Sequence, residues 1–242
     1  MAPWIADLRL AENLLADIPG LDQEAFSVGS VAPDSGVPDE RHEHFTPPPA
    51  VTHFHTPEGA SFPIADLAFY REHLRPALAG KADSRRASFL LGYYFHLLAD
   101  ILWFRQIGEP TQARFKPQFD ANPDFIWEVK RDWYGLDLAF VRANPDCLYW
   151  RVFLGARCPQ DYLPYLPASA IAERVQEIKD LYRRTDDEIE AWYGDRPGVY
   201  LSQAEYDSFV DGNRRRLSQA YTTLTTANPS TEGHASVFEL GL

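Results

Sequence analysis

The chain has 242 residues, of which 45% are hydrophobic and 14% aromatic, so it is long enough to bury one sizeable core. Its formal net charge of −12 and sequence pI near 5.0 argue against coating nucleic acid and against electrostatic docking on anionic membranes. A small phosphate ester is not excluded as a ligand, because a bound metal can supply local positive charge.

Hydrophobic periodicity predicts an all-α fold, with one multi-helix bundle over residues 1–224 and a C-terminal tail over 225–242. The predicted helices, in chain order, cover residues 4–16, 23–30, 63–79, 83–107, 123–143, 148–154, 167–193 and 202–223. Asp83 is expected to cap the fourth helix, and the seventh is expected to have Pro167 at its first position and Gly194 just past its end. No alternating strand-like runs recur at regular spacing.

Residues 31–61 are expected to form a loop that is rich in proline and holds four histidines. A structureless loop of that length inside a compact domain usually has a functional reason, or folds around something. A bound metal ion would satisfy this condition.

Cysteine usage and hydropathy bear on the compartment. Two cysteines, Cys147 and Cys158, are too few for a disulfide framework; free thiols in a reducing cytosol are favoured, although a single pairing stays open. We expect no signal peptide, because the N-terminus lacks a basic region followed by an apolar run and a cleavage site. We expect no transmembrane segment, because the apolar run 89–104 is interrupted by His96 and Asp100 and is too short for a bilayer. A cytoplasmic protein is therefore expected, of unknown oligomeric state.

His96 and Asp100 lie four residues apart in the most apolar stretch of the chain, residues 87–103. This spacing puts both side chains on one face of a helix, one turn apart. A buried aspartate is costly unless it is paired or binds a metal, and an imidazole with a carboxylate can hold a cation such as Zn²⁺. By itself the pair could equally be a buried hydrogen bond that orients a loop.

Two further segments favour a metal site. Asp34 lies in a turn between Gly29 and Gly36, and His53 follows the proline-rich segment. With His96 and Asp100 they form two imidazoles and two carboxylates, which is the composition of a metal shell. Their spacing does not show whether they meet in space.

Several motifs occur in a fixed order: Gly-Ser-Val-Ala-Pro-Asp-Ser from residue 29, Phe-Thr-Pro-Pro from 45, Thr-His-Phe from 52, and Leu-Gly-Tyr-Tyr-Phe-His-Leu-Leu-Ala-Asp from 91. In this order, over about the first 140 residues, the chain resembles the zinc-dependent phospholipase C family of bacterial proteins. The resemblance implies the all-helical fold that these enzymes share with a group of single-strand nucleases. It also implies that Asp34, His53, His96 and Asp100 are zinc ligands, with Asp100 bridging where more than one metal is bound.

The chain departs from the family pattern at two points. Family members often carry a histidine in the first helix where this chain has Asp7, which can still ligate zinc but could equally be a capping or exposed acid. The secreted phospholipases also place further histidines after the His-x-x-x-Asp helix, whereas here none follows His96 until His234. One or two zinc ions are therefore expected, with Asp7 as the weakest ligand.

Other polar residues were weighed as additional ligands. The candidates in the loop are His42, His44 and His55, and those on the helix after the core helix are Asp132 and Asp137. Solvated surface positions are favoured for most of them, with His55 the strongest alternative, and His73 is expected on an exposed helix face. Trp103 shares a face with Asp100 and could either wall the site or belong to the core.

The sequence thus predicts a metal-dependent hydrolase, most consistent with a zinc-dependent phosphoesterase, in which Asp34 is a ligand or the base that orients the attacking water. Gly-rich phosphate loops, nucleophile elbows and Cys-x-x-Cys pairs do not occur in the sequence. The expected substrate is a small-molecule or lipid phosphoester, and nucleic acid is disfavoured. The alternatives are a non-catalytic protein that keeps a degenerate structural metal site, and a single-strand nuclease of the same architecture.

Overall fold

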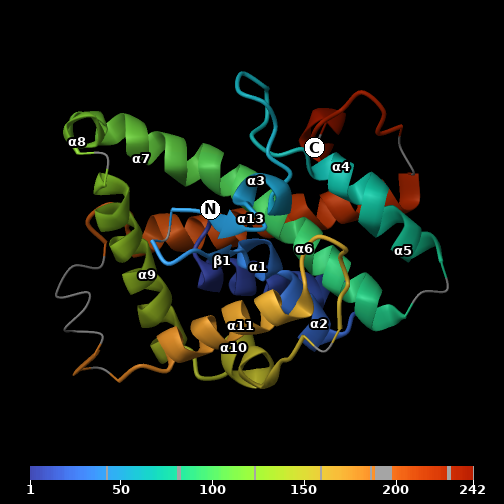
Figure 1. The fold of residues 1–242 in the computed structure, drawn as a ribbon, viewed down its shortest axis with the longest axis horizontal. Coiled ribbons are helices and arrows are strands. Elements are labelled where there is room, and N and C mark those ends of the chain that lie inside the picture. The colour runs from blue at the N-terminus through green and yellow to red at the C-terminus, as the bar shows by residue number, and fades with distance from the viewer. Residues whose placement is uncertain are drawn as a thin grey trace.

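The protein is a bundle of helices, which confirms the predicted all-α class (Figure 1). The computed structural model describes residues 1–41, 43–80, 83–122, 124–158, 160–185, 187–188, 198–227 and 230–241. Its α-helices are α1 (Trp4–Asp17), α2 (Gln23–Gly29), α3 (Pro49–Thr52), α4 (Asp66–Phe69), α5 (Arg75–Ala79), α6 (Ser84–Trp103), α7 (Glu109–Arg114), α8 (Lys116–Ala121), α9 (Phe125–Ala143), α10 (Leu148–Arg151), α11 (Ala168–Tyr182) and α13 (Gln203–Thr222).

Helix α6 runs through the middle of the molecule, as Figure 1 shows, and every residue from Ser88 to Trp103 is buried. Its start is fixed by the Asp83 side chain, which accepts a hydrogen bond from the Arg85 amide at 3.0 Å, as predicted. Its end was predicted at Ile107, but the helix continues through the π-helical segment η3 (Phe104–Gly108) into α7. Pro110 has no amide hydrogen to donate to the helix. The π-helical hydrogen bonding of η3, directly before it, accommodates this missing donor.

By length and composition alone, the continuous helix Ser84–Arg114 could cross a membrane. However, 89% of its most apolar window is buried inside the protein, as in the core helix of a folded domain. Cys147 and Cys158 are both free thiols.

The segment 31–61 was predicted to be loop throughout, and this was wrong in part. It contains the 3₁₀ turn η1 (Ala32–Asp34), a small antiparallel hairpin of β1 (Val37–Pro38) and β2 (Phe45–Thr46), and the helical turn α3. The helix predicted from Pro63 starts only at Asp66, because residues 63–65 lie extended against 54–56 and exchange backbone hydrogen bonds with them.

Two other predicted boundaries were wrong. The helix predicted to run from residue 167 to 193 ends at Tyr182, and Pro167 is its N-cap rather than its first helical residue. Thr185 and Glu188 exchange hydrogen bonds in the pattern of a capping box. This pattern marks the start of a new helical turn, so the preceding helix does not continue through it. Gly194 lies outside the described residues. Helix α8 lies in a stretch where no helix was predicted.

The end of the chain packs against α4. The Val237 amide donates to the Asp66 carboxylate at 3.1 Å, the Leu67 amide donates to the Ala235 carbonyl, and the Val237 side chain is fully buried. The 3₁₀ turn η6 (Val237–Leu240) is thereby docked beside α4, where Figure 1 places the C-terminus.

Helices α2 and α6 cross in direct backbone contact at two glycines. A Cβ atom on Gly29 would lie 2.1 Å from the Phe89 carbonyl oxygen, and one on Gly92 would lie 2.2 Å from the Phe26 carbonyl oxygen. Neither distance is possible for a real side chain, so this crossing requires glycine on both helices. It fixes the residues after α2 against the middle of α6.

We therefore expect Gly92→Ala to destabilise the protein by about 1–3 kcal/mol or more, because the two helices must move apart. Gly212→Ala is the matched control, because Gly212 lies in α13 with open space around it. Alanine there should be neutral or stabilising by up to about 1 kcal/mol. Urea unfolding of both variants measures the difference, and equal midpoints would show that the crossing does not constrain the fold.

Candidate metal centre

Three elements bring four predicted ligands together in the interior. His96 and Asp100 lie one turn apart on α6, Asp34 ends η1, and His53 directly follows α3. The side chains of all four are at most 6% exposed.

The nitrogen and oxygen atoms of these side chains face one another at short distances. The Nε2 atoms of His53 and His96 are 3.3 Å apart. Asp34 Oδ1 is 3.2 Å from His53 Nε2 and 4.0 Å from His96 Nε2. Asp100 Oδ2 is 3.6 Å from each of the two Nε2 atoms. Asp34, His53 and His96 form the tightest group, with ligand atoms within 4.8 Å of one another.

The other ring nitrogen of each histidine is held by a neighbour. His96 Nδ1 lies 2.9 Å from the Ser30 carbonyl, which can only accept, so this nitrogen carries the proton and donates. His53 Nδ1 lies 3.0 Å from the Thr52 hydroxyl. Both rings therefore direct Nε2 into the cluster, the arrangement that ordinarily orients a metal-binding histidine.

The two carboxylates are also fixed by donors on their outer sides. The Trp4 indole donates to Asp34 Oδ2 at 2.8 Å, and the Ala2 amide donates to Asp100 Oδ1 at 2.7 Å. Burial opposes ionisation of Asp34, but its hydrogen bond with His53 and the charge of His96 hold its pKa well below the usual range. Asp34 Oδ1 has no hydrogen-bond donor beyond the imidazoles and faces the cluster.

Asp7, the fifth predicted ligand, lies behind His96. Its Oδ2 is 3.4 Å from His96 Nδ1, the nitrogen that points away from the cluster, and neither of its oxygens has another partner among the described residues. Burial raises the pKa of Asp7 to about 7. This position suits a carboxylate that orients a histidine better than one that shares its ion.

The donor set fits a zinc ion. Nitrogen and oxygen ligands at about 2.0–2.1 Å from one tetrahedral zinc lie about 3.3 Å from each other. The distances among Asp34, His53 and His96, from 3.2 to 4.0 Å, are close to that value, and Asp100 Oδ2 lies 3.6 Å from each imidazole nitrogen. Two ionised carboxylates buried beside two imidazoles also leave negative charge that a divalent cation would neutralise. That these residues bind a metal stays a prediction.

The remaining candidates lie elsewhere. His55 is exposed, with its ring 5.7 Å from that of His53; His44 is also exposed, and His42 lies outside the described residues. Asp132 accepts four backbone amides from residues 198–201, and Trp103 belongs to the core against Trp133 and Phe209.

Asp137 is fully buried, and it anchors α1 by accepting the Ile5 amide together with the hydroxyls of Tyr182 and Tyr206. His73, predicted to be exposed, is buried. The rings of Phe54, Phe69 and Tyr165 surround it, and two of these come from distant segments.

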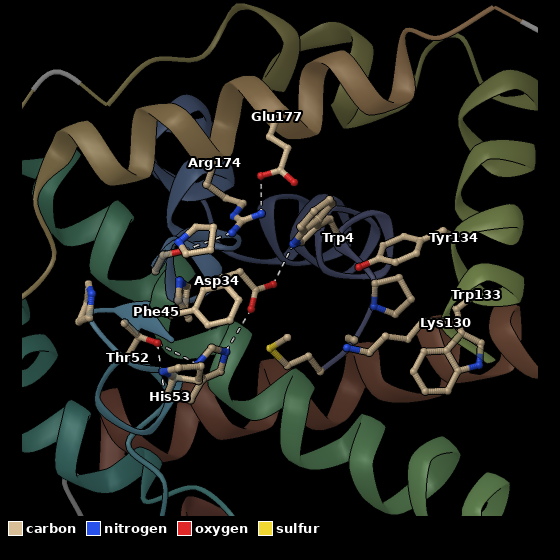
Figure 2. Close-up of a pocket in the computed structure, with 18 of the residues that line it drawn as sticks. Trp4, Asp34, Phe45, Thr52, His53, Lys130, Trp133, Tyr134, Arg174 and Glu177 are labelled. Atoms are coloured by element: carbon tan, nitrogen blue, oxygen red, sulfur yellow. Dashed lines mark hydrogen bonds and ion pairs between the residues drawn. The ribbon is translucent and has the colours of Figure 1, made fainter. Parts of the chain in front are cut away.

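A pocket of about 520 Å³ opens onto Asp34 and His53 (Figure 2). Aromatic and proline side chains form most of its wall, among them Trp4, Phe45 and Trp133. Lys130 from α9 and Arg174 from α11 add positive charge. The sequence analysis did not identify Lys130, because a lysine on an amphipathic helix gives no signal that it faces a pocket.

Comparison with families of known proteins matches residues 5–107 to the family described as zinc dependent phospholipase C. All five predicted ligands lie in that segment, whereas α9 and α11 lie beyond it. The comparisons with curated proteins and with solved structures gave no match.

We expect the purified protein to contain zinc and His96→Ala to lose it, because the variant removes a nitrogen at the centre of the cluster. His234→Ala is the control, since that histidine is partly exposed and pairs with Glu239 at 3.0 Å. Elemental analysis after gel filtration gives the zinc content of each. Equal zinc in wild type and His96→Ala would place the metal elsewhere.

The metal-free protein should lose stability as the pH rises from 6.5 toward 10. Burial lowers the pKa of His96, but the charges of Asp7 and Asp100 outweigh it and raise the pKa from 6.5 to about 10. Between these values the folded state keeps a proton that the unfolded state has released, so the free energy of unfolding falls by up to about 1.4 kcal/mol per pH unit.

Urea unfolding with a chelator at several pH values measures this slope. Zinc should remove it, since a bound imidazole is already neutral, and zinc affinity should rise with pH over the same range. Unfolding free energy that is flat or rising over this range in the metal-free protein would contradict the assignment of a protonated His96.

Proposed function

We propose that this protein is a zinc-dependent hydrolase of phosphoesters, because residues 5–107 match the zinc-dependent phospholipase C family. The family match and the His/Asp cluster support the coarser description, a metal-dependent hydrolase of the phospholipase type. The single observation that carries the finer proposal is the juxtaposition of the cluster and the pocket. Asp34 and His53 belong to both.

His53, His96, Asp34 and Asp100 would hold the ion, and Asp7 would keep His96 in the required orientation through Nδ1. When bound, zinc supplies positive charge for the phosphoryl oxygens and lowers the pKa of a coordinated water toward neutrality. We propose that this cluster holds one zinc ion. A second ion would need ligands beyond the four side chains that face one another.

Asp34 has the central role among the protein's own groups. Its lowered pKa keeps it ionised at neutral pH, and the Trp4 indole prevents rotation of the carboxylate. Asp34 Oδ1 faces the imidazoles and would ligate the ion, and because Asp34 also lines the pocket, its carboxylate can orient a water that enters from there. A strongly acidic carboxylate suits orientation of that water better than full removal of its proton.

The pocket argues against the structural-site alternative. Structural zinc sites are closed, whereas catalytic ones keep access for water and substrate. Here two of the proposed ligands line a cavity large enough for a small organic molecule. The absence of histidines between His96 and His234 still argues for fewer ions than the secreted phospholipases hold.

The substrate is proposed to be a small-molecule or lipid phosphoester rather than nucleic acid, in keeping with the net charge of −12. A cytoplasmic location stays a prediction that rests on cysteine usage.

Asp34→Asn should reduce turnover by about 10²–10⁴-fold while leaving the fold intact. Asparagine is nearly isosteric and can still accept the Trp4 hydrogen bond through its amide oxygen, but it lacks the negative charge. The assay is hydrolysis of chromogenic phosphomonoesters, phosphodiesters and a phospholipid by zinc-replete protein. Asp120→Asn is the control, because Asp120 is an exposed acid on α8 that pairs with Lys116 at 2.7 Å.

A zinc-replete wild type without activity on any substrate would favour the structural-site alternative. Unchanged turnover in a folded Asp34→Asn variant would mean that the reaction occurs elsewhere.

A further inference from the structure

The charged side chains that line the pocket differ in whether they form ion pairs and hydrogen bonds with other residues. Arg174 forms an ion pair with Glu177, reaches the Gly36 carbonyl at 3.4 Å and stacks over Trp4, so its charge is paired although its Nε has no hydrogen-bond partner among the described residues. Asp34 faces the imidazoles. Lys130 forms no ion pair or hydrogen bond with any described residue, and its ammonium only stacks on the Trp127 ring at 4.9 Å from the centroid.

Lys130 is also half-buried and directed inward. Figure 2 shows its side chain extending from α9 toward the side of the pocket that holds Asp34 and His53. Burial lowers the pKa of Lys130, although the charges of Asp34 and Asp100 act in the opposite direction. The negative charges of both carboxylates therefore act on the ammonium, although it forms no ion pair or hydrogen bond with either of them.

An ion at the cluster changes this balance. A divalent cation would neutralise the carboxylates of Asp34 and Asp100, whose negative charges act on Lys130. A partly desolvated ammonium without a counter-ion is costly. The metal-loaded pocket would therefore present a positive charge beside the cluster, with apolar and aromatic walls around it.

We propose that Lys130 binds a negatively charged oxygen of the substrate and makes the pocket select phosphoesters with an apolar, uncharged ester group over those with a cationic headgroup. This inference rests on the proposed function, because it places the phosphate between Lys130 and the metal cluster. The apolar wall would take the ester group, and a quaternary ammonium there would be repelled by Lys130. Since α9 lies outside the segment that matches the family, this specificity is a property of the remaining chain.

The test compares phosphocholine with 3,3-dimethylbutyl phosphate, in which carbon replaces the quaternary nitrogen without changing the shape. Each is titrated calorimetrically into zinc-loaded protein, so that the readout is binding and needs no turnover. The wild type should bind the uncharged isostere more tightly. Lys130→Met should weaken binding of the isostere roughly tenfold or more, since one charged contact is lost. It should also reduce the difference in affinity between the isostere and phosphocholine.

Two further variants separate charge from packing. Lys130→Arg keeps the positive charge and should retain most of the affinity and the preference. Lys116→Met should behave as wild type, because Lys116 is an exposed lysine on α8 that pairs with Asp120. Urea unfolding and zinc content are measured on every variant, and Lys130→Met should match wild type in both.

The proposal is overturned if the wild type binds neither ligand, if phosphocholine binds as tightly as its isostere, or if folded Lys130→Met keeps wild-type affinity and preference. Failure of the proposed function looks different. In that case Lys130→Met still loses binding while no phosphoester is hydrolysed. In the converse case, hydrolysis depends on Asp34 while Lys130→Met binds both ligands as the wild type does. That result would support the proposed function and reject this role of Lys130.

Discussion

The backbone contact between α2 and α6 is the constraint on which the rest of the site depends. Gly29 and Gly92 remove the side chains that would hold these helices apart, and each would place a Cβ within 2.2 Å of the opposite backbone. The residue after Gly29 then lies against the turn of α6 after Gly92, and the Ser30 carbonyl accepts from His96. Four residues further on, Asp34 reaches the same face of α6.

A cluster of ionisable groups so deep in the protein is costly unless their charges compensate each other or a cation. The protein holds the carboxylates with donors from the N-terminal segment: the Trp4 indole donates to Asp34 and the Ala2 amide donates to Asp100, while the Thr52 hydroxyl lies 3.0 Å from His53 Nδ1. Helix α1 carries Trp4 and also presents Asp7 to His96. It is kept in place by Asp137 of α9 through the Ile5 amide.

The two parts of the chain contribute differently to the centre. The segment that matches the phospholipase family supplies every proposed ligand. Helices α9 and α11, beyond that segment, supply Lys130, Trp133 and Arg174 to the lining of the pocket. The proposed ligands and the residues proposed to select the substrate therefore lie on different elements.

The sequence by itself determined the features that depend on local geometry. Apolar periodicity identified most helices, Asp83 marked the start of α6, and the spacing of His96 and Asp100 placed both on one face of that helix. Motif order gave Asp34 and His53 as their partners through family resemblance, and the structure brings all four together.

Only the tertiary structure decided what depends on contacts between distant segments. It placed Asp7 behind His96, buried His73 among rings from other elements, and directed Lys130 into the pocket. Helix periodicity cannot predict these positions, because an identical amphipathic stretch can face solvent, a neighbouring helix or a cavity. Which of these it faces is settled by long-range packing, here by how closely two glycines allow α2 to approach α6.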